Sequence, residues 1–188
     1  MIGNRQRGSA TIEMALVGIP IIFTLISIFE MSRGMWIYHT LAYSVKAGVR
    51  LASVHGENCI NNPPGVTNNC PKFISDIAKV VKDAAVGLDP DKTLLTFNAN
   101  NGDITRCYLG SSSTTTVTTT LGSGVGCLSL TTTQWPPSAN SENQVGKQIR
   151  IDIRTRFRSA IAMIWPGAAP ISFAEADLGA RSMDIVQF

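Results

Sequence analysis

The chain has 188 residues, of which 44% are hydrophobic and 15% are charged, and its formal net charge is +3. This length suits one modest domain with an attachment segment, and the charged share is well below the roughly 25% of a typical soluble domain. Arg5 and Arg7 supply two of the positive charges from the N-terminal tail. The rest is nearly neutral, which excludes a globally basic nucleic-acid-binding domain, so we expect no nucleic-acid partner.

An apolar segment follows this tail. Residues 14–29 carry no charge, and the longer stretch 9–29 carries only Glu13. Because roughly 20 residues cross a bilayer core as a helix, the sequence predicts a transmembrane helix at 9–29. The arginines before it place the N-terminus in the cytoplasm and the C-terminal bulk outside. A cleaved secretory signal is the alternative, but the run ends in bulky residues and lacks the small-x-small site that such a signal needs.

Glu13 is a carboxylate inside this membrane-length segment, where a charge is normally paired or functional unless it reaches the interface. The order Gly8, Ser9 and then Glu13 resembles a prepilin signal, with its basic leader, glycine, and glutamate at the fifth mature position. That resemblance implies cleavage after Gly8 by a membrane-embedded prepilin peptidase, so that residues 1–8 are the leader. Glu13 would then offset the charge of an amino group when helices bundle in a low-dielectric environment.

The helical pattern continues beyond the apolar segment. Residues 30–55 contain no proline, and apolar side chains recur at steps of three and four. These side chains are Met31, Met35, Tyr38, Leu41, Ala42, Val45, Val49 and Ala52. We therefore expect one helix from about Ser9 to about Val54, with residues 30–56 as a stem that ends near Gly56. Small residues on the stem allow another element to approach closely.

The N-terminal quarter resembles the TadE-like family, the minor pseudopilins of tight-adherence (type IVc, Flp-type) pilus systems. The matching residues are Arg7, Gly8, Ser9, Glu13, Ala15, Leu16 and the stem run Ala47-Gly48-Val49-Arg50-Leu51-Ala52. The resemblance implies a pseudopilin that supports assembly of an adhesive pilus. The implied partners are the prepilin peptidase, other pseudopilins, the major pilin, the inner-membrane assembly platform and the lipid bilayer.

The same resemblance implies a single-pass protein of the bacterial inner membrane, with its C-terminal domain in the periplasm, outside the cell or in the pilus. Two other kinds of function stay open for this chain. One is a membrane-anchored binding or adhesion module that is not processed, and the other is an anchored periplasmic enzyme. Detection of an intact leader would favour the unprocessed module, and substrate turnover would favour the enzyme.

Four cysteines lie beyond the apolar segment, at Cys59, Cys70, Cys107 and Cys127. None forms a C-x-x-C motif, so neither a zinc ribbon nor a redox pair is expected. An even number of cysteines on the outer side predicts disulfides in an oxidising compartment. Of the three connectivities, we favour Cys59–Cys70 with Cys107–Cys127 because each closes one local loop. Four free buried thiols are the alternative.

The outer domain, residues 57–188, begins with turn-forming residues at 57–71. An amphipathic pattern predicts a helix at 72–87, and Asn101-Gly102 between two β-prone runs predicts a hairpin. The Ser/Thr-rich segment 111–126 is expected to be a flexible loop, with a β-hairpin tip as the alternative.

The clearest strand is expected at 147–158, where apolar residues alternate with Arg150, Asp152 and further arginines. This basic row is read as a solvated face, the alternative being contact with an acidic partner or lipid headgroups. The apolar patch 160–165 is expected to pack on the stem, and a last strand follows with a bulge at Gly179. The predicted fold is α+β: the long helix packed on a small antiparallel sheet of about four strands, with a second helix and disulfides.

We find no catalytic constellation. The two histidines, His39 and His55, lie on the predicted stem or at its end, and the nearest Cys/His pair, His55 with Cys59, is better explained by a disulfide. Asp89 and Asp91 flank a proline and read as a turn, not as a cation site. We therefore expect no enzyme, no cofactor and no metal.

Overall fold

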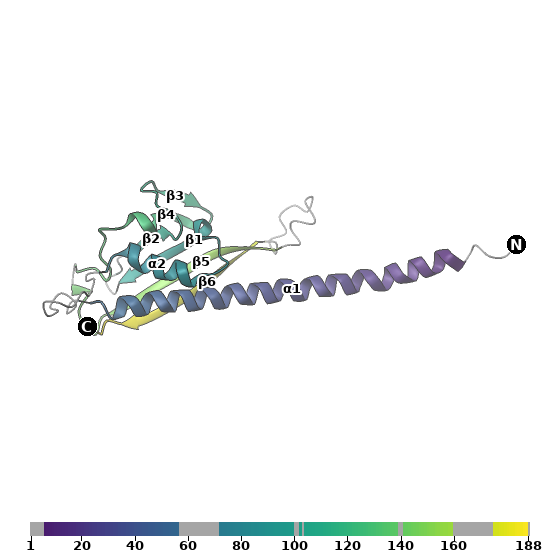
Figure 1. Ribbon diagram of the computed structural model, residues 1–188, viewed down its shortest axis with the longest axis horizontal. Helices are drawn as coiled ribbons and strands as arrows, with labels where there is room; N and C mark the ends of the chain where they lie inside the picture. Colours follow the sequence, from purple (N-terminus) through teal and green to yellow (C-terminus); the bar gives the residue numbers. More distant parts are fainter. Residues whose placement is uncertain are drawn as a thin grey trace.

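The computed structural model describes residues 6–56, 72–99, 102, 104–138, 141–159 and 175–187. For residues 6–9 and 175 it describes the backbone alone. One long helix, α1 (Gln6–Ser53), runs the length of the molecule, and an α+β domain lies along its C-terminal half (Figure 1). The N-terminal half of α1 projects from that domain. This confirms the predicted long apolar helix.

Helix α1 is continuous in spite of Pro20 in its interior. Pro20 has no N–H to donate to the carbonyl of Leu16, a loss that often bends a helix. The helix nevertheless continues, and in its next turn the hydroxyl of Thr24 donates to the carbonyl oxygen of Pro20 at 2.9 Å. At the other end the backbone N–H of His55 donates to the carbonyl of Ala52 at 3.1 Å. The helix therefore ends just before Gly56, where the sequence placed its terminator.

The second helix, α2 (Ile74–Ala84), is shorter than the predicted 72–87 but lies within it. The carboxylate of Asp76 accepts a hydrogen bond from the backbone N–H of Phe73 at 3.3 Å, which satisfies one free donor at the helix start. The side chains of Ile77 and Val81 are completely buried. A Cβ atom at Gly48 of α1 would lie 2.5 Å from Cγ2 of Val81, so α1 and α2 meet at this glycine.

Six strands form one sheet in the order β3-β4-β2-β1-β5-β6. They are β1 (Thr93–Ala99), β2 (Ile104–Tyr108), β3 (Val117–Thr119), β4 (Gly122–Gly126), β5 (Gln148–Arg158) and β6 (Glu175–Ile185). Short 3-10 helices η2 (Pro90–Lys92) and η3 (Cys127–Ser129) precede β1 and follow β4. The sheet has more strands than the small antiparallel sheet of about four that we expected. It is also mixed, because β2 and β4 pair in parallel.

The parallel pair follows from the path of the Ser/Thr-rich segment. After β2 the chain crosses over, and β3 and β4 form an antiparallel hairpin that brings β4 back beside β2 in the same direction. The expected flexible loop is therefore wrong over β3 and β4, and the alternative of a hairpin is supported. The β1–β2 hairpin is also confirmed, and Gly102 adopts a positive φ of 82° in its turn.

Strands β5 and β6 pair along their whole length in one register, from Gln148 opposite Ile185 to Arg158 opposite Glu175. The expected bulge at Gly179 is wrong, because Gly179 lies opposite Arg154 without any shift of register. A Cβ atom there would lie 3.3 Å from the carbonyl oxygen of Ile153. The glycine therefore marks a close backbone approach.

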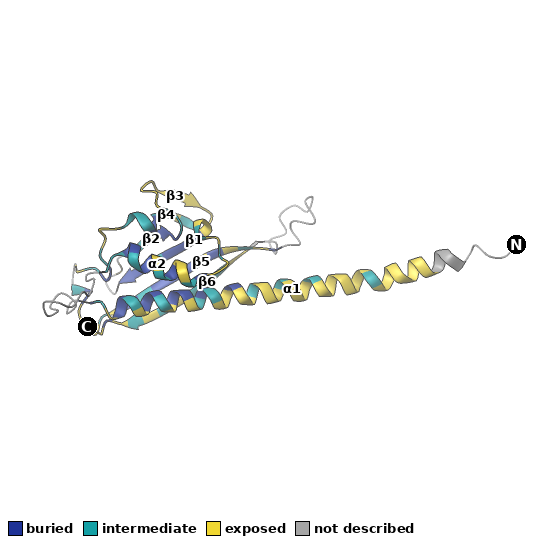
Figure 2. Ribbon diagram, viewed as in Figure 1, coloured by how far each residue is buried: buried dark blue, intermediate teal, exposed yellow. Residues whose placement is uncertain are grey.

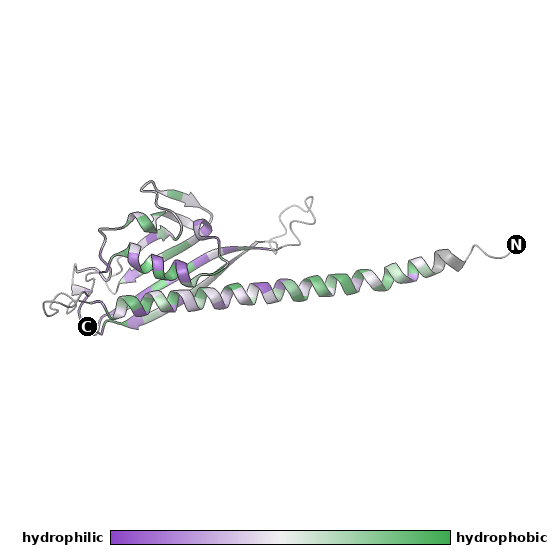
Figure 3. Cartoon of the chain, viewed as in Figure 1, coloured by the Kyte–Doolittle hydropathy of each residue, from purple (hydrophilic) through white to green (hydrophobic). Residues whose placement is uncertain are grey.

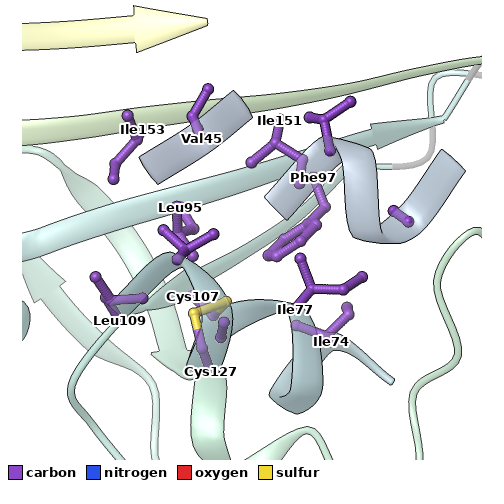
Figure 4. Close-up of a cluster of buried hydrophobic side chains, with 14 of the residues drawn as sticks. Val45, Ile74, Ile77, Leu95, Phe97, Cys107, Leu109, Cys127, Ile151 and Ile153 are labelled. Carbon is purple, nitrogen blue, oxygen red and sulfur yellow. A yellow bond between two sulfur atoms is a disulfide. The ribbon is translucent and has the colours of Figure 1, made fainter. Parts of the chain in front are cut away.

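The hydrophobic core lies between α1, α2 and one face of the sheet (Figure 4). Leu41, Val45 and Val49 of α1 are almost fully buried. They belong to the same cluster as Ile151 and Ile153 of β5 and residues of β1. At roughly 1.5–3 kcal/mol for each large side chain removed from water, this layer contributes much of the domain's stability.

The predicted disulfide Cys107–Cys127 is present, with the two Cα atoms 4.9 Å apart. It ties the end of β2 to η3 next to the core. Three other expectations lie outside the described residues. They are the Cys59–Cys70 disulfide, the turn at 57–71 and the apolar patch at 160–165.

Candidate functional site

The N-terminal half of α1 presents an apolar surface that the domain does not cover (Figures 2 and 3). Of the described residues, one helical span is long and apolar enough to cross a membrane, and its most apolar window has a mean hydropathy of 2.3 with none of it buried. Large apolar side chains remain 50–75% exposed along it, for example Met14 at 75% and Phe29 at 75%. Such a surface needs lipid or other helices around it.

Glu13 lies exposed on this apolar half of α1. The backbone is helical through Gly8 and Ser9 as well. Ser9 and Glu13 are four residues apart, so they share one face of the helix, separated by a rise of about 6 Å. If Ser9 became the N-terminus, its amino group and the Glu13 carboxylate would lie one turn apart.

At the level of Glu13, another side of the helix is shallow and apolar. Residues with little side-chain bulk, Thr11, Ala15 and Gly18, line a hollow together with Ile19 and Ile22. Small residues at this spacing let a second helix approach closely in a membrane. The hollow lies on the side of α1 roughly opposite Glu13, because 3.6 residues per turn separate Glu13 from this row. A neighbouring helix can pack there while Glu13 faces another neighbour, a feature that we did not infer from the sequence.

The exposed half of α1 meets the domain at Arg33. The guanidinium of Arg33 donates to the carbonyl oxygen of Arg158 at 3.2 Å and lies 5.3 Å from the centre of the Phe157 ring. Three residues on, Trp36 packs over Gly87, where a Cβ atom would collide with the indole ring. The helix is therefore fastened to the domain at the level where its burial begins, with Ile37 the first buried apolar residue of α1.

The predicted apolar stripe of the stem is only partly right. Leu41, Val45 and Val49 are buried as expected, whereas Met31 and Met35 remain exposed at 70% and 60%. The domain buries apolar side chains of α1 only from Ile37 onward, so Met31 and Met35 in the first turns of the stem stay as exposed as the apolar side chains before them.

The arginine row of β5 carries acidic partners. Asp152 accepts hydrogen bonds from Nε of Arg181 at 2.6 Å and from Nδ2 of Asn98 at 3.3 Å, and Nε of Arg150 lies 3.4 Å away. Arg156 is opposite Asp177 in the β5–β6 register. This face is therefore a cross-strand pattern of both charges, and its excess of positive charge is smaller than the β5 sequence alone indicates.

The remaining candidates behave as structural residues. The hydroxyl of Tyr108 donates to the carbonyl oxygen of Gly122 at 2.7 Å and also contacts the Thr119 hydroxyl, which anchors the Ser/Thr-rich hairpin. Asp89 caps η2 and forms an ion pair with Lys92 at 3.0 Å, as a turn residue does. The part of the chain that the structure describes contains no cluster of His, Cys, Asp or Glu that could hold a metal ion.

The histidines do not form a site either. His39 lies exposed on α1, and a ring nitrogen of His55 lies 2.6 Å from the carbonyl oxygen of Leu51 in the last turn. Cys59, with which His55 forms the nearest Cys/His pair in the sequence, lies outside the described residues.

Comparison with protein-family models matches the N-terminal part of the chain. The model of a family described as TadE-like protein matches residues 8–50. The match covers nearly all of α1, including Gly8, Glu13 and Gly48, and none of the domain that follows. It confirms the TadE-like resemblance of this segment and indicates a protein associated with a Tad pilus. No curated protein and no solved structure matches the chain.

Proposed function

We propose that this chain is a pseudopilin of a Tad-type pilus. A prepilin peptidase cleaves it after Gly8, and the mature chain then supports assembly of a pilus used in adhesion. The observation that carries the proposal is the continuous helix α1, which joins the TadE-like segment, its exposed apolar surface and the core of the outer domain in one element.

In this proposal the N-terminal half of α1 has two successive environments. Before assembly it spans the inner membrane, with the N-terminus in the cytoplasm and the domain on the periplasmic side. During assembly its apolar surface packs against other pilin helices, and the hollow at Thr11, Ala15 and Gly18 admits a neighbouring helix. Glu13 then pairs with an amino group within the bundle, since an unpaired carboxylate there would be costly.

The partners of the proposed function are the prepilin peptidase, other pseudopilins, the major pilin and the inner-membrane assembly platform. The large domain favours a minor subunit, because the main pilins of the family resembled are short and almost entirely helical. We propose no catalytic role, cofactor or metal for the domain, since its described polar residues serve turns, caps and cross-strand pairs.

The decisive measurement is the mass of the mature N-terminus in cells that make the pilus. The proposal predicts a chain that begins at Ser9, and an uncleaved chain in a strain without the peptidase. Gly8→Ala should block cleavage, because the peptidase recognises the glycine before the cut. Gly18→Ala is the matched control: it makes the same change on the same helix, where a Cβ atom meets nothing within 4 Å, and it should leave cleavage intact.

An intact leader on a chain that still supports pili would overturn the proposal in favour of an unprocessed membrane-anchored binding module. A second measurement locates the mature chain. Recovery in sheared pili would place it in the filament, whereas recovery only in membranes would place it at the assembly platform.

A further inference from the structure

The turns of α1 between residues 28 and 36 have two different sides. Glu30 and Arg33 lie seven and four residues before Ile37 and share its helix face, which continues into the buried core at Leu41. Met31, Met35 and Trp36 lie off this face and are 70%, 60% and 51% exposed. Here the charged side of the helix is turned toward the domain, and Met31 and Met35 are turned away from it.

The domain already contacts α1 at this level. Arg33 is bound to the end of β5 through the Arg158 carbonyl and the Phe157 ring, and Trp36 packs over Gly87 next to α2. These contacts show which end of the sheet lies nearer to the exposed half of α1. The Arg158 end of β5 lies next to Arg33, whereas the far end lies next to Ser53, whose carbonyl accepts from the backbone N–H of Gln187 at 2.8 Å.

The rise of the helix fixes where the membrane surface lies. From Met14 to Trp36 an α-helix rises about 33 Å, close to the roughly 30 Å of a hydrocarbon core, and each headgroup layer adds only about 5–7 Å. The exposed apolar surface and the first domain contacts overlap between Met31 and Trp36. No spacer therefore separates the bilayer from the domain.

We propose that the end of the domain formed by Arg33, Trp36, Phe157 and Arg158, which we call the membrane seat, rests in the headgroup layer of the outer leaflet. Met31 and Met35 face lipid on one side of α1, and the indole of Trp36 occupies the interface, where aromatic rings are favoured. The exposed part of the Arg33 guanidinium binds lipid phosphate. The partner of this surface is a phospholipid headgroup layer, and the inference rests on the membrane-spanning role of α1 in the proposed function.

The test uses the full chain in vesicles of phosphatidylethanolamine and phosphatidylglycerol. Some of the lipid carries a nitroxide on its headgroup, which quenches nearby tryptophan. In a background with Trp36→Phe and Trp165→Phe, where buried Trp135 remains as a constant signal, one variant carries Phe157→Trp in the seat. The matched control carries Val145→Trp, an exposed site (55%) near the far end of the sheet. The seat predicts several-fold stronger quenching of Phe157→Trp.

A second reporter covers the case in which Phe157→Trp does not fold. Native Trp36, with only Trp165 replaced, should be quenched by headgroup nitroxide more strongly than by nitroxide near the bilayer centre. Replacing Tyr43 by Trp in the Trp36→Phe, Trp165→Phe background moves the reporter seven residues toward the C-terminal end of α1, away from the membrane. The tryptophan at position 43 should lose most of that quenching. Arg33→Gln should weaken quenching at position 157, whereas Arg50→Gln, which removes an equal charge from the far end of α1, should not.

The outcomes separate the two proposals. If the protein does not float with vesicles, α1 does not span the membrane and the proposed function falls with the seat. If the protein floats but Phe157→Trp and Val145→Trp are quenched equally, the seat alone is wrong. If Arg33→Gln changes nothing, Arg33 does not hold the domain at the headgroups.

Discussion

Gly48 and Gly34 lie on the same helix in opposite surroundings. A Cβ atom at Gly48 would lie 2.5 Å from Cγ2 of Val81 and 3.4 Å from Cγ2 of Ile77, both buried side chains of α2. A Cβ atom at Gly34 would meet nothing within 4 Å. Gly48 belongs to the small-residue run of the TadE-like segment, and the structure shows what this run allows, namely the close packing of α2 on α1.

Gly48→Ala should therefore destabilise the domain by about 1–3 kcal/mol, the usual cost of overpacking a filled core. Gly34→Ala is the control and should be neutral or stabilising by up to about 1 kcal/mol, because alanine has the higher helix propensity. Chemical denaturation of the full chain, followed by near-UV circular dichroism, measures both. Equal effects at the two positions would contradict close packing at Gly48.

Glu13 can be tested separately from cleavage. Glu13→Ala and the nearly isosteric Glu13→Gln should both be cleaved after Gly8, since the cut lies outside the side chain they change. Both should impair assembly, because neither can pair with an amino group in the bundle. The mass of the N-terminus and the amount of sheared pili measure the two steps. Ser27→Ala, at an exposed position of the same helix outside the hollow, is the control. Normal pili from both Glu13 variants would show that the carboxylate merely sits at the interface.

Among the secondary-structure elements, the β3–β4 hairpin has the weakest attachment to the sheet. Strand β4 pairs with β2 through only two residue pairs, Cys107 with Val125 and Tyr108 with Gly126. The disulfide Cys107–Cys127 lies directly at this pairing, and the Tyr108 hydroxyl bonds to Gly122 O. The disulfide and the Tyr108 hydrogen bond therefore hold the hairpin more firmly than its short backbone pairing with β2 does.

The double substitution Cys107→Ser, Cys127→Ser should lower the free energy of unfolding by about 3 kcal/mol, the chain-entropy value for a loop of this size, given that the cysteines are 20 residues apart. Amide exchange should accelerate most in β3 and β4. Ser112→Ala, an exposed change in the same segment, is the control. Uniform acceleration across β5 and β6 would instead indicate that the disulfide stabilises the whole sheet.

The elements differ in how well sequence predicted them, for physical reasons. Strand β5 was predictable because Ile149, Ile151 and Ile153 alternate strictly. Gly8 and Glu13 could be proposed from sequence because the signal that they resemble is contiguous in the chain. The parallel β2–β4 pair was not, since nothing local shows which strand a hairpin will join. The same limit hid the contact of Arg33 with Arg158, which are 125 residues apart.

At the scale of the whole molecule, α1 is both the membrane segment and a wall of the domain core (Figure 2). Residues 10–36 are largely exposed and residues 37–53 pack against α2, β5 and β6. Because the helix is continuous between these halves, the orientation of the domain follows the tilt of the helix. In the proposed assembly, a force on the N-terminal half would therefore act directly on the core.

This arrangement predicts where the chain can be cut. A fragment of residues 57–188 loses Leu41, Val45 and Val49, whose burial is worth about 5–9 kcal/mol in total, comparable to the entire net stability of a domain of this kind. It should therefore fail to fold cooperatively. A fragment of residues 32–188 keeps these side chains and the Arg33 contact with Phe157, and it should fold. Thermal unfolding by circular dichroism compares the two after oxidative refolding, and a cooperative transition in the shorter fragment would show that α1 only covers a core that is complete without it.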